Sequence, residues 1–278
     1  MATNNKFPFE KELIEFYLQG NSIASCGREY GLSTYRVKNI LLKNDIKTRT
    51  RKEQNIIENK KRRKYVNDNY FDIIHENQAY LLGFLAADGT ISKDDNGIKI
   101  GLSSVDHNFL EKVKKEMSIE REVKKEETNN GFFVSTLAFS SEKIKKRLAE
   151  FGIVPNKTYK KTINFDKIPE KYKIYFIKGY FDGDGSFDSK NGRVRICAHL
   201  DYILKDFQEY LLTKNIKGNI YAFNKGKNSI IYSLEYSTLP GLKIMELFYQ
   251  NQDLQLDRKY QKYKTLLNKR NQETNASK

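Results

Sequence analysis

Apolar and polar positions in the first 50 residues follow the spacing of short helices. Runs that begin FEKEL, SIASC and STYRV carry apolar residues three and four positions apart, and the first two runs end at Gly20 and Gly31. This order predicts a helix-turn-helix module in residues 1–50. Residues 33–43 are its expected recognition helix, with Ser33 as the N-cap.

The third run is predicted to turn a polar face outward. The residues expected on that face are Tyr35, Arg36, Lys38 and Asn39. Their side chains suit phosphate oxygens and base edges, which predicts contact with DNA. A three-helix module that only packs against the rest of the protein is the alternative.

Residues 51–69 are polar and basic. Residues 47–64 contain nine Lys or Arg against two Glu, including the run KKRRK. Because nothing in this stretch supplies a core, we interpret it as a linker that could lie along a phosphate backbone. A nuclear-localisation signal would use the same residues and is the lesser alternative.

Two similar apolar stretches dominate the rest of the chain. They read YLLGFLAADGT (residues 80–90) and YFIKGYFDGDGS (residues 175–186), and their Asp-Gly pairs are 96 residues apart. Each places a small residue four positions after a glycine, Gly83 with Ala87 and Gly179 with Gly183. Such a helix face is nearly free of side chains, so the two helices can pack backbone to backbone.

That packing would place Asp88 and Asp184 together, because each follows its helix face directly. Two carboxylates at close range favour a divalent metal ion. A single Asp-Gly pair is usually only a turn that ends a helix, so the prediction rests on the repeat.

The segment after each stretch shows the same succession of periodicities. In IKIGL (residues 98–102), Ile98, Ile100 and Leu102 fall on one face and Lys99 on the other, which is typical of a strand. Further expected elements of the first half are a helix from residue 106, strands over 121–126 and 132–139, and a helix over 142–151. Those of the second half are a strand over 194–198, a helix over 201–212, a hairpin over 219–236 and a helix over 239–249.

These elements predict an α+β fold of two pseudo-symmetric αββαββα units. The expected boundaries are residues 70–160 for the first unit, 161–270 for the second and 271–278 for a polar tail.

The repeated stretches resemble the motif of the LAGLIDADG homing endonuclease family. In LLGFLAADG and IKGYFDGDG the acid at the eighth motif position is present both times. At the sixth position, where the family often has an acid, the first copy has Ala86 and the second keeps Asp182. The resemblance continues through GIVPNKTYK (residues 152–160) and LQLDRKYQKY (residues 254–263).

This resemblance implies a single-chain, site-specific endonuclease whose two sheets form a β-saddle over double-stranded DNA. Asp88 and Asp184 would hold two or more Mg²⁺ ions, with the peptide oxygens of Ala87 and Gly183 completing the coordination. Each aspartate would serve one strand, and cleavage across the minor groove would leave short 3′ overhangs.

Two lysines are expected to form a second layer of the site. Lys157 and Lys259 occupy comparable places after the last predicted helix of each unit. In the family such lysines lie near the scissile phosphate and its attacking water, where a positive charge stabilises the transition state. Most lysines are solvated surface residues, which is the alternative.

Base reading is expected on the outward faces of the strands. The candidate residues are Lys99, Lys124, Arg193, Arg195, Tyr221 and Lys227. Arg and Lys pair with guanine edges in the major groove, which admits a two-stranded ribbon. Exposed strand faces are also polar in proteins that bind nothing, so the expectation rests on the whole face.

Composition agrees with a polyanionic partner. Lys and Arg outnumber Asp and Glu by 50 to 35, which gives a net charge of +15. Cys26 and Cys197 lie far apart, so neither a disulfide framework nor a zinc site is indicated. The three histidines show no ligand spacing and receive no assigned chemistry.

The N-terminus lacks the apolar region of a signal peptide, and no stretch approaches the ~20 apolar residues of a membrane span. We therefore expect an intracellular monomer, in the cytoplasm of a bacterial or phage-infected cell, that binds a long asymmetric DNA target. An RNA maturase that assists the splicing of intron RNA is the first alternative. A non-catalytic DNA-binding regulator with the same fold is the second.

Overall fold

The computed structural model describes residues 8–62, 65–224, 230–250 and 254–276, and it describes no side chains for residues 59–62, 102–104 and 273–276. The chain divides into two compact units, Met1–Arg63 and Lys64–Lys278. Lys227, one of the expected base-reading residues, lies outside the described residues. No helix in the described part is long and apolar enough to cross a membrane.

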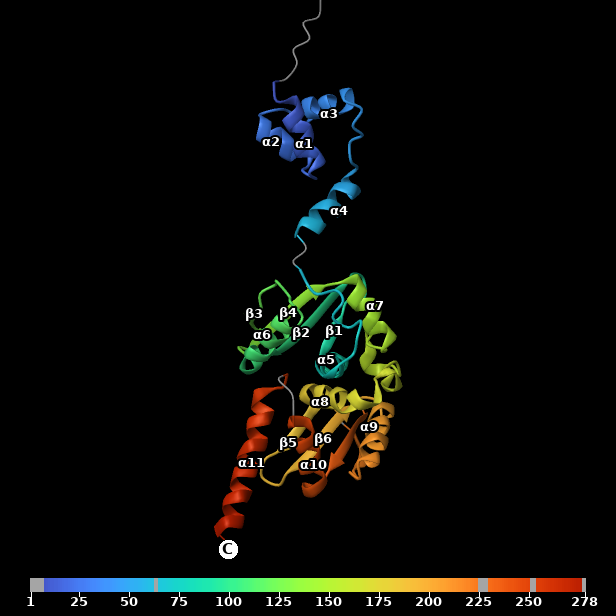
Figure 1. The fold of residues 1–278 in the computed structure, drawn as a ribbon, viewed down its shortest axis with the longest axis vertical. Coiled ribbons are helices and arrows are strands. Elements are labelled where there is room, and N and C mark those ends of the chain that lie inside the picture. Colours follow the sequence, from blue (N-terminus) through green and yellow to red (C-terminus); the bar gives the residue numbers. More distant parts are fainter. Residues whose placement is uncertain (1–7, 63–64, 225–229, 251–253, 277–278) are drawn as a thin grey trace, which may run out of the picture. The chain divides into compact units, whose positions relative to one another are not determined.

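The N-terminal unit is helical, as the periodicity predicts. Its helices are α1 (Glu10–Leu18), α2 (Ile23–Tyr30), α3 (Thr34–Lys43) and α4 (Arg51–Arg62) (Figure 1). A small core that includes Leu13, Tyr17 and Leu41 joins α1 to α3. The Oγ atom of Ser33 accepts a hydrogen bond from the backbone N–H of Arg36 at 3.2 Å, so Ser33 is the N-cap of α3. Helix α4 occupies the stretch interpreted as a linker.

The C-terminal unit contains two four-stranded antiparallel sheets of the same topology. The first sheet has the order β1-β2-β4-β3 and the second the order β5-β6-β8-β7. The strands are β1 (Gly89–Ile91), β2 (Gly97–Ser103), β3 (Lys124–Glu127), β4 (Phe133–Ser140), β5 (Gly185–Asp188), β6 (Arg193–Ala198), β7 (Asn219–Asn224) and β8 (Ile230–Tyr236). The predicted pseudo-symmetric α+β fold is thereby confirmed.

Each sheet is accompanied by three helices in equivalent positions along the chain. They are α5 (Glu76–Ala87), α6 (His107–Glu116) and α7 (Glu142–Glu150) in the first half, and α8 (Lys173–Asp184), α9 (Tyr202–Thr213) and α10 (Thr238–Tyr249) in the second. Short 3₁₀ turns cover Ser104–Asp106, Lys157–Tyr159, Phe165–Lys167 and Glu170–Tyr172. In Figure 1, α5 and α8 lie side by side between the two sheets.

Strand register separates a core face from an outward face in both sheets. In the first sheet, Ile98 pairs with Phe139 and Ile100 pairs with Leu137, and all four are buried. Lys99 lies between the two isoleucines and is exposed on the opposite face. Alternation with a period of two therefore fixes which residues each sheet can offer to a partner.

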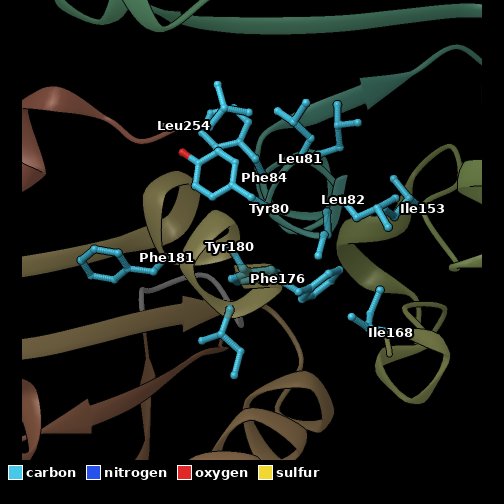
Figure 2. Packing of buried hydrophobic residues seen from close by; sticks show 14 of the residues in the cluster. Tyr80, Leu81, Leu82, Phe84, Ile153, Ile168, Phe176, Tyr180, Phe181 and Leu254 are labelled. Carbon is cyan, nitrogen blue, oxygen red and sulfur yellow. The ribbon is translucent and has the colours of Figure 1, made fainter. Parts of the chain in front are cut away.

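The central helices carry most of the core between the sheets. Tyr80, Phe84, Phe176 and Phe181 are nearly fully buried. Figure 2 shows side chains of α5 and α8 packed in one continuous cluster, with Leu254 from the region before the last helix at its edge.

A last helix, α11 (Asp257–Ala276), has no counterpart in the predicted order of elements. It includes residues 271–276, for which a polar tail was expected, and it places Lys259 within its first turn. Its sequence is mostly polar, and within its described part Lys259, Tyr263 and Leu266 are buried at intervals of four and three residues. The sequence pattern did not predict this helix, because polar residues fill most of its positions.

Candidate active site

Two glycines allow α5 and α8 to touch through their main chains. A Cβ atom added at Gly83 would lie 1.9 Å from the carbonyl oxygen of Phe176. The same atom at Gly179 would lie 1.9 Å from the carbonyl oxygen of Tyr80. Any side chain larger than hydrogen would force the helices apart, so these two glycines set the distance between them.

The helices remain in contact at their C-terminal ends. A Cβ atom added at Gly183 would lie 2.4 Å from the Cβ atom of Ala87 and 3.2 Å from the Oδ2 atom of Asp88. The carboxylate of Asp88 therefore lies against the α8 main chain, one residue before Asp184. The fold brings both acids to the same end of the helix pair.

Both acids are held in an environment that disfavours their charge. Burial raises the pKa of Asp88 to about 6, with a second contribution from the negative charge of Asp184. Burial also raises the pKa of Asp184, and the positive charges of Lys157 and Lys259 oppose this shift. Two partly desolvated carboxylates whose charges interact favour a cation between them.

Lys259 closes the end of α8. Its Nζ atom donates hydrogen bonds to the carbonyl oxygens of Phe181 at 2.6 Å, Asp182 at 2.8 Å and Gly185 at 2.7 Å. The residue is only 3% exposed, and burial lowers its pKa to about 8. A cation at this position satisfies carbonyl groups that a helix C-terminus leaves without partners.

Lys157 occupies the matching position beside α5. Its Nζ atom donates a hydrogen bond to the carbonyl oxygen of Gly89, which follows Asp88 as Gly185 follows Asp184. Unlike Lys259, it is only half-buried. Burial lowers its pKa, against the charges of Asp184 and Asp88.

A cavity of about 200 Å³ opens beside this lysine. Lys157 and Asp184 line it together with Lys160, Tyr180 and His199. The His199 ring lies 4.9 Å from the Tyr159 ring, centroid to centroid. Sequence reasoning assigned His199 no chemistry; its one sequence signal is its place directly after β6, the strand that pairs with β5.

Asp182, the acid at the sixth motif position, is fully buried away from solvent. Its Oδ2 atom accepts hydrogen bonds from the Tyr80 hydroxyl at 2.7 Å and from the backbone N–H of Leu256 at 3.1 Å. Its Oδ1 atom has no hydrogen-bond partner among the described residues. Asp182 therefore ties α5 and the start of α11 to α8.

The expected DNA-reading residues of the sheets are exposed. These are Lys99, Lys124, Arg193, Arg195 and Tyr221. Arg195 is also paired, because its Nε atom lies 2.8 Å from Oε1 of Glu235 on the neighbouring strand β8. In the separate N-terminal unit, Tyr35, Arg36 and Lys38 are exposed on α3 and Asn39 is half-buried.

The donor set at the helix ends fits a hard divalent cation. The described residues contain no group of three or more His, Cys, Asp or Glu that could hold a metal ion. Mg²⁺ is commonly bound by one or two carboxylates, with water and phosphate oxygens as the remaining ligands. Asp88 and Asp184 supply this minimum, and the carbonyl groups of Ala87 and Gly183 belong to helix turns that lack intrahelical donors.

The chain thus contains two fused α+β repeats. One helix of each repeat packs against the other through glycines, and each of these helices is followed or ended by an aspartate. These features define the class of the protein. The model of the LAGLIDADG-like domain family matches residues 75–152 and 171–274. This match covers more than half of the chain, which therefore belongs to that family.

Solved structures resemble the chain at low sequence identity. A mesophilic variant of the homing endonuclease I-DmoI is 16% identical, covering 67% of this chain and 98% of its own, with a TM-score of 0.45. I-DmoI in complex with DNA and Mn is also 16% identical, covering 67% and 100%, with a TM-score of 0.45. Full-length DUF199/WhiA from Thermatoga maritima is 17% identical, covering 73% and 65%, with a TM-score of 0.45. No curated protein sequence matches the chain.

Proposed function

We propose that this protein is a site-specific, Mg²⁺-dependent endonuclease that hydrolyses one phosphodiester in each strand of double-stranded DNA. The observation that carries the proposal is the convergence of Asp88 and Asp184 at glycine-packed helix ends, each beside a lysine. Family membership and the net charge of +15 support it.

In this proposal Asp88 and Asp184 would hold the metal, and the carbonyl oxygens of Ala87 and Gly183 would supply further ligands. Bound Mg²⁺ would lower the pKa of water and neutralise charge that develops on the phosphate. Water attacks phosphorus, the bond from phosphorus to the leaving oxygen breaks, and that oxygen takes up a proton. The ammonium group of Lys157 faces the same cavity as Asp184 and would stabilise the added negative charge.

Lys259 has a different part in this proposal. Three carbonyl oxygens surround its Nζ atom, and it is almost fully buried. It would act as a positioning residue that fixes the end of α8, and with it Asp184, rather than as a group that touches the phosphate.

The DNA would lie along the outward faces of both sheets, where Lys99, Lys124, Arg193 and Arg195 are exposed. Cleavage across the minor groove would leave short 3′ overhangs. Because the two halves present different side chains, a monomer would recognise an asymmetric target. The N-terminal unit would add contacts to flanking DNA through Tyr35, Arg36 and Lys38 of α3.

Selection for cleavage from a randomised duplex library in Mg²⁺ tests this function. On a recovered site, Asp88→Asn and Asp184→Asn should each slow cleavage by about a thousandfold or more while still binding the duplex. Asp166→Asn is the matched control, since the Asp166 side chain is 96% exposed. Cleavage by Asp184→Asn at the rate of the unmodified protein would refute the proposal.

The same preparation distinguishes a maturase from a nuclease. Binding of duplex DNA and of structured intron RNA is measured at matched salt, because both depend on phosphate contacts. Tighter binding of the RNA, without cleavage of any duplex, would favour the maturase function.

A further inference from the structure

The outward face of the second sheet carries exposed aromatic side chains. Tyr221 and Phe223 alternate along β7 and are 47% and 46% exposed, with ring centroids 6.5 Å apart. Phe223 pairs with Ile231 on β8, which is half-buried. We call Tyr221, Phe223 and Ile231 the aromatic cluster.

Strand register places the aromatic cluster on the face proposed to meet DNA. Ile220, between Asn219 and Tyr221, pairs with the fully buried Leu234 and therefore points toward the core. The cluster lies on the opposite face, which also carries the exposed Arg195.

Arg195 helps to hold this surface in place. Its guanidinium carbon lies 5.8 Å from the centre of the Phe223 ring, and its Nε atom lies 2.8 Å from Oε1 of Glu235. The charge of Arg195 is thus partly balanced by a carboxylate on the same face, and its plane rests near an aromatic ring. Around Tyr221 and Phe223 the outward face of the second sheet therefore offers aromatic rings, and the nearby charge of Arg195 is paired with Glu235.

The first sheet differs, because its described strands carry no pair of exposed aromatic rings on the outward face. Phe132 lies just before β4 and is 72% exposed, and Phe133 is 48% exposed but shares the core face of β4 with Leu137. The corresponding strand of the first sheet, β3, reads KKEE, and all four residues are exposed. Lys124 pairs with Thr136 and shares the outward face with Lys99. Solvent-exposed apolar groups gathered on one face commonly mark a contact surface, and the two sheets therefore differ in the chemistry they offer.

We propose, building on the proposed endonuclease function, that the aromatic cluster recognises thymine methyl groups in the half-site bound by the second sheet. The C5-methyl of thymine is the apolar group that the bases present in the major groove. Residues two apart on a strand are separated by about 6.8 Å, which matches about two base steps of 3.4 Å. Lys124 and Lys99 of the first sheet instead suit guanine edges.

Deoxyuridine tests the contact directly, because it lacks only the methyl group of thymine. Thymines of a selected site are replaced one at a time, and duplex affinity is measured by fluorescence anisotropy with Mg²⁺ withheld. Each contacted methyl should contribute about fourfold in Kd, and the sensitive positions should fall in one half-site. Equal affinity for all substituted duplexes would overturn the proposal.

Variants identify the side chains that sense the methyl group. Phe223→Ala and Tyr221→Ala should each abolish the deoxyuridine effect at the thymine that the removed ring contacts, whereas Tyr221→Phe should keep the effect because it keeps the ring. Leu212→Ala on α9 is the matched control, because it removes a similarly exposed apolar side chain outside the sheet face, and it should also keep the difference. Urea denaturation of each variant checks that the substitution leaves the free energy of unfolding close to that of the unmodified protein. An unchanged deoxyuridine effect in both alanine variants would overturn the proposal.

Two further outcomes separate this inference from the function on which it rests. If the alanine variants lose affinity for single-stranded RNA but not for duplex DNA, the cluster is an RNA-stacking surface and the thymine proposal is wrong. If the unmodified protein binds and cuts no duplex, the endonuclease function itself fails. Cleavage of a selected duplex without any deoxyuridine effect refutes only the thymine contact.

Discussion

The two halves of the C-terminal unit share their acids and differ in what supports them. Helices α5 and α8 both carry a glycine at the crossing and an aspartate at the end. Where α8 has Lys178 and Asp182 buried, α5 has Leu82 and Ala86. The two halves are therefore alike at the proposed metal ligands, and they differ at the positions two and six residues before each aspartate.

The buried Asp182 of α8 is connected to the start of helix α11, which has no counterpart after α7. The carboxylate of Asp182 accepts a hydrogen bond from the backbone N–H of Leu256, just before α11. Arg258 in turn pairs with Asp106 of the first half at 3.0 Å, and Lys112 pairs with Asp257 at 2.9 Å. The start of α11 is therefore fixed to both halves, whereas Lys157 lies on a short 3₁₀ turn beside an open cavity.

Substituting a crossing glycine should have the largest effect, since this feature is common to both halves. Gly83→Ala and Gly179→Ala each place a Cβ against a carbonyl oxygen, and each should lower the free energy of unfolding by about 4 kcal/mol or more. Urea denaturation measures the loss. Gly101→Ala is the control, because an added Cβ there meets its nearest atom only at 3.9 Å. Unfolding midpoints that match the unmodified protein would show that the helices do not depend on this contact.

Lys259→Met should destabilise the protein more than Lys157→Met does. Removing its Nζ atom leaves three buried carbonyl groups and the buried Asp182 without their donor or countercharge, at a cost of about 3 kcal/mol. Lys157→Met removes one hydrogen bond at a half-buried site and should cost about 1 kcal/mol or less. Equal losses in urea denaturation would mean that the two lysines have the same structural part.

The two lysines should also differ in their effect on DNA hydrolysis, where Lys157 is expected to matter more than Lys259. With Lys157 replaced by Met in a stably folded protein, hydrolysis of one DNA strand should slow by about a hundredfold, leaving a nicked product. Conversion of supercoiled plasmid to nicked and linear forms measures both strands. Lys167→Met serves as the control. Equal slowing of the two strands would argue against a strand-specific lysine.

The smallest effect concerns the charge shared by the two acids. The pKa of Asp88 is raised from 3.8 to about 6, so the folded protein retains a proton that the unfolded chain releases between these values. Stability of the metal-free protein should therefore fall as pH rises through this window. Asp88→Asn should be about 2 kcal/mol more stable than the unmodified protein at pH values above the window. Urea unfolding in a chelator at both ends of the window measures this, and no gain at the higher pH would contradict it.

Local periodicity was sufficient to predict most of the fold. Ile98 and Ile100 alternate with polar positions because one face of β2 meets the core, and the glycine spacing marks the helix crossing. The charge and environment of single side chains were less accessible. Lys259 resembles any surface lysine in sequence, and only the tertiary fold brings three carbonyl oxygens to its Nζ atom.

Parts of the candidate site also depend on distant segments meeting. His199 reaches the cavity of Asp184 because the chain after β6 returns beside the Lys157 turn. Tyr221 was expected on the outward face of its strand, whereas Phe223 was not singled out, because its neighbour Ile231 follows only from the pairing of β7 with β8. Such register is fixed between strands and not within one.

The contact of the Gly83 and Gly179 main chains has a consequence for how such a protein can change. Peptide groups, whose dimensions do not vary with sequence, set the separation of the two helix ends. Residues of the sheets and outer helices can therefore change to suit a new partner while the distance between the two aspartates stays constant. Retargeting by substitutions on the strands should leave the spacing of the reaction centre untouched.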